Sequence, residues 1–125
     1  INLKDTADEI IKKIKKAKTD STPIPDNEKD LKIRPEALNL LNIYGNITNK
    51  PLTSVLNEMN GKDFSYVKSK LSDALVEVIC PIGKRIRQYM DDKGFLHEVL
   101  IKGKEKAEIK SEENLKKIRD IIGLI

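Results

Sequence analysis

Few side chains in this sequence could act as catalytic groups. It contains one cysteine, Cys80, and one histidine, His97. A cysteine nucleophile needs a nearby base to activate the thiol, and these two residues fall on segments that are predicted to be different helices. We therefore interpret Cys80 as a buried structural cysteine, and we favour a packing or capping role for His97 over catalysis.

Other patterns that support catalysis are also missing from the sequence. A single cysteine and a single histidine exclude a multi-cysteine zinc site and a histidine-rich metal centre. The acidic pairs Asp91-Asp92 and Glu112-Glu113 are adjacent, so their side chains point apart on a helix and read as solvated caps. The six glycines are scattered singly and form no phosphate-binding loop. We expect no catalytic residues, no cofactor-binding residues and no metal ligands in this chain.

Positive charge is the remaining chemical signal. The 24 Lys and Arg residues exceed the 20 Asp and Glu residues, which gives a net charge of +4, too small a surplus to indicate a nucleic-acid-binding protein by itself. The cations do gather in three places, which are Lys12 to Lys18, then Lys84 with Arg85 and Arg87, and finally Lys102, Lys104, Lys106 and Lys110. The first two clusters are consistent with binding to an acidic partner and also with a solvated helix face, which is the favoured interpretation of Lys12 to Lys18.

The elements that must position these cations are predicted to be helices. Thr6 followed by Glu9 is a capping box, and Ile10, Ile11 and Ile14 then recur at helical spacing. We predict that this first helix ends near Asp20. The following segment, 20–34, contains Pro23 and Pro25 and is predicted to be a long loop.

The rest of the chain continues the helical pattern. Pro35 fits the first turn of a second helix, Pro51 opens a short third one, and Asn60-Gly61 is a C-cap signal. A long apolar stripe predicts a Pro-containing helix over 63–92, with Pro81 inside it and with Ile82 and Ile86 facing inward, and a C-terminal helix over 95–122. The fold class is therefore all-α, with about five helices in an irregular bundle, and we assign 1–125 to a single domain.

Composition narrows the class of protein further. The chain is 38% hydrophobic and 35% charged, and its apolar residues are aliphatic, with 17 Ile and 13 Leu against five aromatic residues. It has no apolar run approaching the roughly 18 residues of a membrane span and nothing that resembles a signal peptide. We expect a soluble protein without a membrane partner, in a reducing cytoplasmic setting.

Several stretches, taken together and in order, resemble bacterial tryptophanyl-tRNA synthetases, which are class I tryptophan–tRNA ligases. The similar part is the C-terminal helical region that follows the KMSKS signature loop, and the resemblance covers essentially the whole chain. Most of its weight rests on IKKIKKAKTD and NLLNIY. The stretches are 8–20, 34–44, 61–62, 71–75, 81–90 and 102–107.

The resemblance implies an enzyme of which this chain is one part. The full-length protein would activate tryptophan with ATP and Mg and attach it to tRNA(Trp). Its catalytic Rossmann domain, with HIGH-type and KMSKS motifs, is absent from this chain, so the fragment is expected to be inactive and to hold no cofactor. The resemblance also implies an anticodon-binding type of helical domain and a full-length homodimer, and leaves a monomer open for the fragment.

The resemblance also points to residues that would contact tRNA. Arg85 lies where the family pattern has an arginine after Pro-Ile, and Lys84 and Arg87 flank it. In the family the first helix lies beside the catalytic side, so Lys12 and Lys16 would serve the signature loop or the acceptor stem. The alternative is a free-standing helical interaction module without tRNA function, and the encoded sequence upstream of Ile1 would discriminate the two.

Overall fold

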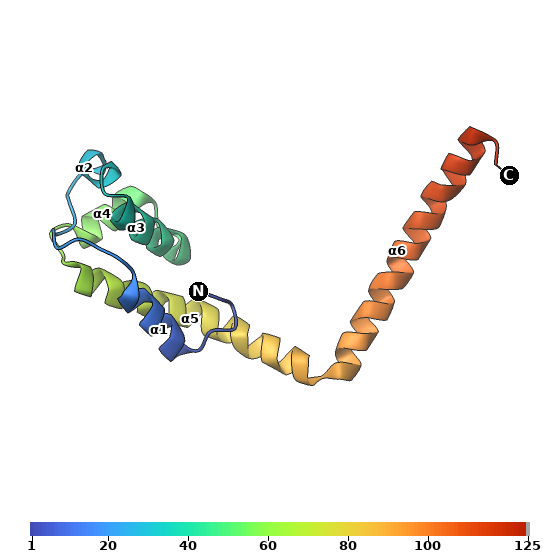
Figure 1. Cartoon of the computed structure of the whole chain (residues 1–125), viewed down its shortest axis with the longest axis horizontal. Coiled ribbons are helices and arrows are strands. Elements are labelled where there is room, and N and C mark those ends of the chain that lie inside the picture. The colour runs from blue at the N-terminus through green and yellow to red at the C-terminus, as the bar shows by residue number, and fades with distance from the viewer. Residues whose placement is uncertain (125) are drawn as a thin grey trace. The chain divides into compact units, whose positions relative to one another are not determined.

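The fold is built from helices alone in residues 1–124, which are the residues that this computed structural model describes. Within them there are six helices and no strand (Figure 1). The all-α prediction is confirmed. The helices are α1 (Ala7–Lys16), α2 (Glu28–Lys32), α3 (Pro35–Thr48), α4 (Leu52–Met59), α5 (Phe64–Asp91) and α6 (Lys93–Ile122).

The chain divides into two compact units. The first comprises Ile1–Arg85 and holds α1 to α4 together with most of α5. The second begins at Ile86 and holds the end of α5 and all of α6.

The boundaries of the two long helices agree with the sequence patterns, whereas α1 ends at Lys16 and not near Asp20 as predicted, and the fold contains one additional helix. The long Pro-containing helix and the C-terminal helix lie at 64–91 and 93–122, within two residues of the predicted bounds. The addition is α2, which lies inside the segment predicted to be a loop. Asn27 caps it by accepting from the backbone N–H of Asp30 at 2.9 Å, and Leu31 is its one buried residue. A helix of five residues is too short to show an apolar period in the sequence.

The capping signals read from the sequence are confirmed. Thr6 and Glu9 form the reciprocal capping box of α1, and Pro35 stands at the start of α3. Gly61 follows α4 with a φ of +69°, a left-handed conformation that glycine adopts without the steric cost of a side chain. Asp92 accepts a hydrogen bond from the backbone N–H of Phe95 at 2.9 Å and so caps α6.

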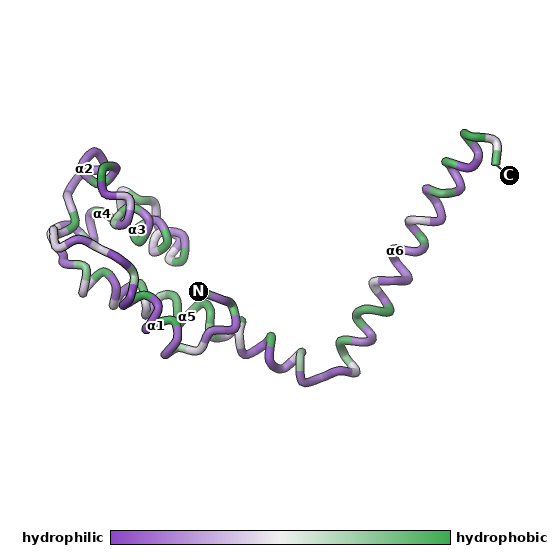
Figure 2. Tube along the Cα trace, viewed as in Figure 1, coloured by the Kyte–Doolittle hydropathy of each residue, from purple (hydrophilic) through white to green (hydrophobic). Residues whose placement is uncertain are grey.

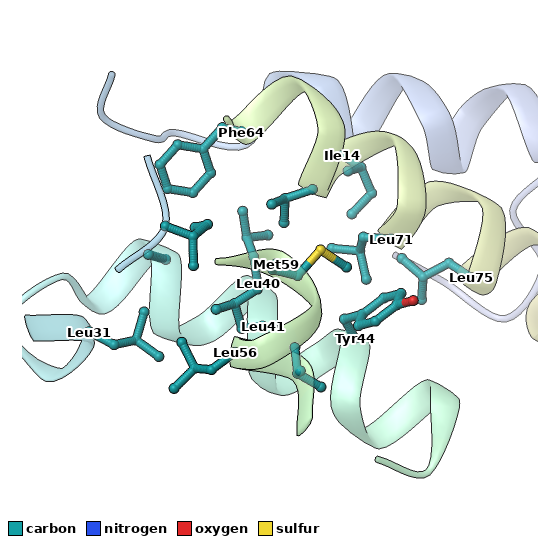
Figure 3. Packing of buried hydrophobic residues seen from close by; sticks show 14 of the residues in the cluster. Ile14, Leu31, Leu40, Leu41, Tyr44, Leu56, Met59, Phe64, Leu71 and Leu75 are labelled. Carbon is teal, nitrogen blue, oxygen red and sulfur yellow. The ribbon is translucent and has the colours of Figure 1, made fainter. Parts of the chain in front are cut away.

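A single aliphatic core holds the first unit together. Side chains from all five of its helices and from the loop residue Ile24 meet in it, and Figure 3 shows most of them converging. Its largest fully buried side chains are those of Ile10, Ile24, Leu31, Leu41, Val55, Met59, Val67 and Leu71. These residues are far apart in the sequence. The core is therefore complete only when α1 packs against α3, α4 and α5.

Two residue predictions need correction. His97 is exposed on α6 and packs in no core, because no described residue of that helix is buried. Ile82, predicted to face inward, is 38% exposed, because the buried positions Ile79 and Gly83 define the inner side of α5 in that turn. Cys80 is half-buried and packs against the core, which agrees in part with its predicted structural role.

The second unit has few internal contacts that bury apolar surface. The rings of Tyr89 and Phe95 stack with their centroids 5.1 Å apart, where α5 ends and α6 begins. Along α6 apolar residues are interspersed with polar ones (Figure 2), and none of the described residues of this helix is buried; Leu100 and Ile118 are more than half exposed. Taken by itself, this unit is therefore dominated by one long helix with no buried residue.

Arg34 holds the connection between α1 and α3 in place. Its guanidinium donates to both carboxylate oxygens of Asp20, at 3.0 and 2.6 Å. It also donates to the carbonyl oxygens of Thr22 and Pro23, at 2.6 and 2.7 Å. The same group lies 5.6 Å from the centre of the Phe64 ring. One side chain thus ties the proline-containing loop to the start of α3 and to the start of α5.

The loop is fixed at a second point by its backbone. The N–H of Ile24 donates to the carbonyl of Lys62, and the carbonyl of Ile24 accepts from the N–H of Gly61, both at 2.9 Å. The side chain of Ile24 is 2% exposed in the core. Because these bonds join the loop to the turn between α4 and α5, the path from α1 to α2 is determined by tertiary contacts.

Replacing Arg34 is expected to destabilise the first unit. Arg34→Ala removes two charge-assisted bonds to backbone carbonyls, so we expect the free energy of unfolding to fall by about 2 kcal/mol. Arg34→Lys should lose nearly as much, because an ammonium cannot reproduce the planar fork. Urea unfolding monitored by circular dichroism measures both. Arg85→Ala, at an exposed position on α5, is the matched control, and an Arg34→Ala midpoint equal to that control would contradict this role.

Candidate nucleic-acid interface

The lysines of α1 differ in what they contact. Lys13 donates to Asp5 at 2.6 Å, so its charge is paired. Lys12 and Lys16 are exposed, and the described residues include no salt bridge to either of them. They are four positions apart and share one side of the helix. Both α1 residues that are predicted to contact tRNA are therefore available to an external anion.

Lys13 holds the carboxylate of Asp5 in place through this ion pair. Its side chain is 7% exposed, and its carboxylate accepts from Lys13 and from the backbone N–H of Asn2 at 2.8 Å. These bonds lower the pKa of Asp5, with the Lys13 bond the largest cause. The ion pair anchors the segment before α1 to the helix, and it shows why the lysine run as a whole is not one uniform binding surface.

The cationic residues of α5 lie away from the side of the helix that packs against the core. Leu75, Ile79 and Gly83 are buried at spacings of four residues and define the side that faces the core. Lys84 and Arg85 follow directly and are both exposed. Arg87 is exposed as well, has an interaction partner of its own, and belongs to the second unit. The predicted group is thus divided between the two units.

The third cluster of lysines is largely paired within its own helix. Along α6, Lys102 lies 3.8 Å from Glu98, Lys104 lies 3.5 Å from Glu108, and Lys110 lies 3.4 Å from Glu113. Exposed pairs of this kind contribute little to stability, but they offset the local positive charge. The interpretation as a solvated helix face therefore fits this cluster.

A groove between α1 and α5 brings together residues that the sequence patterns did not single out. It has a volume of about 570 Å³. Lys15 and Lys68 contribute cations, Asp73 contributes one carboxylate, and Ile11 and Phe64 are apolar. Hydroxyl groups line the rest, from Thr19, Ser65, Ser69 and Ser72. The Ser spacing on α5 could have been read from the sequence, but its pairing with α1 could not.

Lys68 also fixes the position of α1 against α5. Its ammonium donates to the carbonyl of Ala17 at 2.7 Å and lies 3.5 Å from that of Lys15. These carbonyls are at the C-terminal end of α1, where the helix dipole favours a cation. The groove therefore has a defined shape, because one of its own lining residues bridges its two walls.

Within residues 1–124, no group of three or more His, Cys, Asp or Glu residues is arranged to hold a metal ion. No helix in this part of the chain is long and apolar enough to cross a membrane.

The sequence matches a family model described as tRNA synthetases class I (W and Y). The match covers residues 1–79, which is more than half of the chain. The chain belongs to this family. This membership favours the synthetase interpretation over the free-standing interaction module.

Relatives of this class I synthetase chain are tryptophan–tRNA ligases. It is 42% identical over 125 residues to the enzyme of Rhizobium meliloti, 38% over 123 residues to that of Caulobacter vibrioides, and 36% over 125 residues to that of Rickettsia felis. These alignments cover 98–100% of this chain and 35–37% of the relatives. The chain therefore spans about a third of their length. The predicted resemblance to tryptophan–tRNA ligases is confirmed.

Acid is expected to destabilise the synthetase chain through its organised carboxylates. The pKa values of Asp5, Asp20 and Glu58 are lowered, mainly by hydrogen bonds from Lys13, Arg34 and Lys50 respectively. A carboxylate whose pKa is lower in the folded state than in the unfolded state stabilises the fold when it is ionised. This contribution is complete at pH values above the unfolded-state pKa, which is 3.8 for Asp and 4.5 for Glu. It is lost as the pH falls through the lower folded-state pKa. The midpoint temperature of thermal unfolding should therefore stay constant near pH 7 and decrease once the pH drops below about 4.5.

Asp5→Asn isolates one of these groups. We expect this variant to be less stable than the unmodified chain at pH 7 and to lose less stability on acidification. Asp8→Asn, at an exposed position in the first turn of α1, is the control. Thermal unfolding from pH 7 to pH 2 measures both, and parallel pH curves for Asp5→Asn and the unmodified chain would refute the contribution of the Asp5–Lys13 pair.

Proposed function

We propose that this chain is the C-terminal, tRNA-binding helical part of a tryptophan–tRNA ligase. The observation that carries the proposal is the alignment over nearly the whole chain with proteins named tryptophan–tRNA ligases, at 36–42% identity. The order of the similar stretches, which begins with the helix that follows the KMSKS loop in this family, supports the C-terminal placement. We assign the chain to the anticodon-binding type of domain on the same basis.

The full-length protein is proposed to activate tryptophan with ATP and Mg and to attach it to tRNA(Trp) in the cytoplasm. Tryptophan and ATP would bind in the catalytic domain, which relatives about three times as long can accommodate. The family resemblance further suggests a homodimer. The role left to this chain is to hold tRNA by its phosphate backbone, for which exposed cations are the appropriate groups.

Arg85 is the proposed main contact, with Lys84 beside it. Both are exposed on α5, whose buried side keeps the helix fixed on the core of the first unit. An arginine presents a planar fork that can donate two parallel bonds to a phosphate, whereas a lysine acts as a point charge. Lys12, Lys16 and Arg87 are proposed as further contacts to the backbone.

Binding of tRNA should be electrostatic and should depend on Arg85. We expect the affinity of the chain for a tRNA(Trp) transcript to fall steeply with salt, with a log–log slope of about 0.7–0.9 for each phosphate contact. Arg85→Glu should weaken binding about tenfold and reduce the slope by about 1. Filter binding at four salt concentrations measures both quantities.

Two controls keep this test specific. Lys29→Glu reverses a charge on the short helix α2, away from the proposed contacts, and should bind as the unmodified chain does. An unrelated tRNA should show the same salt dependence but a lower affinity if the chain contributes to selection. Negligible binding of either tRNA by the unmodified chain at low salt would refute the proposal that this part binds tRNA.

A further inference from the structure

The groove between α1 and α5 is a second polar surface, distinct in its residues from the cations assigned to tRNA above. Its volume of about 570 Å³ falls within the range typical of ligand-binding clefts. Its walls come from two helices of the first unit, so its geometry is fixed by the same core that buries Ile10, Ile14 and Leu71. It does not depend on the second unit.

The chemistry of the lining matches a phosphate group. The lining includes two lysines and one carboxylate, Asp73, so the groove carries a surplus of positive charge. The hydroxyl groups of Thr19, Ser65 and Ser69 can each donate a hydrogen bond to a phosphate oxygen, whereas Ser72 is buried. Ser65 lies in the first turn of α5, where the helix dipole is positive. Lys68 already donates to α1 carbonyls, which leaves Lys15 as the more available cation.

The length of the lining favours a chain of phosphates over a single anion. The groove residues on α5 extend from Phe64 to Asp73, which at 1.5 Å per residue is about 13 Å along the helix. Hydroxyls and lysines are distributed along that length instead of converging on one point. The exposed Lys12 and Lys16 of α1 continue the positive surface beyond the groove.

We propose that this groove binds the phosphodiester backbone of an RNA strand, with Lys15, Ser65 and Ser69 as its contacts. The inference deepens the proposed function and rests on it, since the RNA would be the bound tRNA. Backbone contacts of this kind position the RNA without reading its sequence. Ile11, which is only partly buried, offers apolar surface against which a ribose can pack.

Two substitutions in the groove test the proposal on the 125-residue chain. Lys15→Glu reverses the exposed cation, and Ser69→Glu introduces a carboxylate at an exposed helical position where Glu is well tolerated. Each should weaken binding of the tRNA(Trp) transcript about five- to tenfold, and Lys15→Glu should lower the salt slope by about 1. Lys29→Glu is the matched charge control, and circular dichroism verifies that all three variants are folded.

The outcomes separate this inference from the proposed function. If Arg85→Glu weakens binding while Lys15→Glu and Ser69→Glu bind as Lys29→Glu does, the groove proposal is wrong and the proposed function stands. If the unmodified chain does not bind tRNA, both are wrong.

A spectroscopic readout identifies the ligand. In ¹⁵N-labelled chain, the amide signals of Ser65 and Ser69 should shift on addition of the transcript. Inorganic phosphate at equal phosphate concentration should shift them less. Larger shifts with inorganic phosphate than with the transcript would overturn the assignment to RNA in favour of a small-anion site.

Discussion

The four hydrogen bonds of Arg34 are the constraint on which the first unit depends. The segment between α1 and α2 contains two prolines and has no regular structure of its own, so it cannot determine where α1 lies. Arg34 binds this segment at Asp20, Thr22 and Pro23, and the backbone of Ile24 pairs with the turn before α5. With the loop held, Ile10 and Ile14 enter the core, and α1 comes to lie beside the first turns of α5 (Figure 1).

The binding surface follows from that placement and from which cations are already paired. Asp5 pairs with Lys13, Glu58 with Lys50, and glutamates of α6 with several of its lysines. Lys68 bonds to the C-terminal carbonyls of α1. Positive charge that remains open to an external anion includes Lys12 and Lys16 on α1, Lys15 in the groove, and Lys84 and Arg85 on α5. A net charge of +4 conceals this distribution, because counting does not distinguish a paired lysine from an available one.

The features of the fold that were predictable from the sequence are those that depend on residues close together in the chain. The capping box of Thr6, the first-turn proline Pro35 and the C-cap signal at Gly61 each act within a few residues, so a sequence pattern records them directly. The helix α2 escaped prediction because five residues carry no measurable period. His97 was misplaced because an apolar neighbourhood in the sequence does not tell whether a helix has another helix against it.

The sequence by itself determined the helical fold class, the approximate bounds of the long helices, the absence of a recognisable catalytic motif and the family resemblance that the relatives bear out. It also supplied Arg85, Lys84 and Lys12 as candidate contacts. Only the tertiary structure decided that Arg34 ties the loop to two helices, that Lys13 is paired, and that Lys15 faces Ser65 and Ser69 across a groove. The physical reason is the distance along the chain between the residues that interact. Caps and periodicity depend on neighbours within one or two turns, whereas ion pairs and grooves depend on residues that are distant in the chain and meet only after the core has formed.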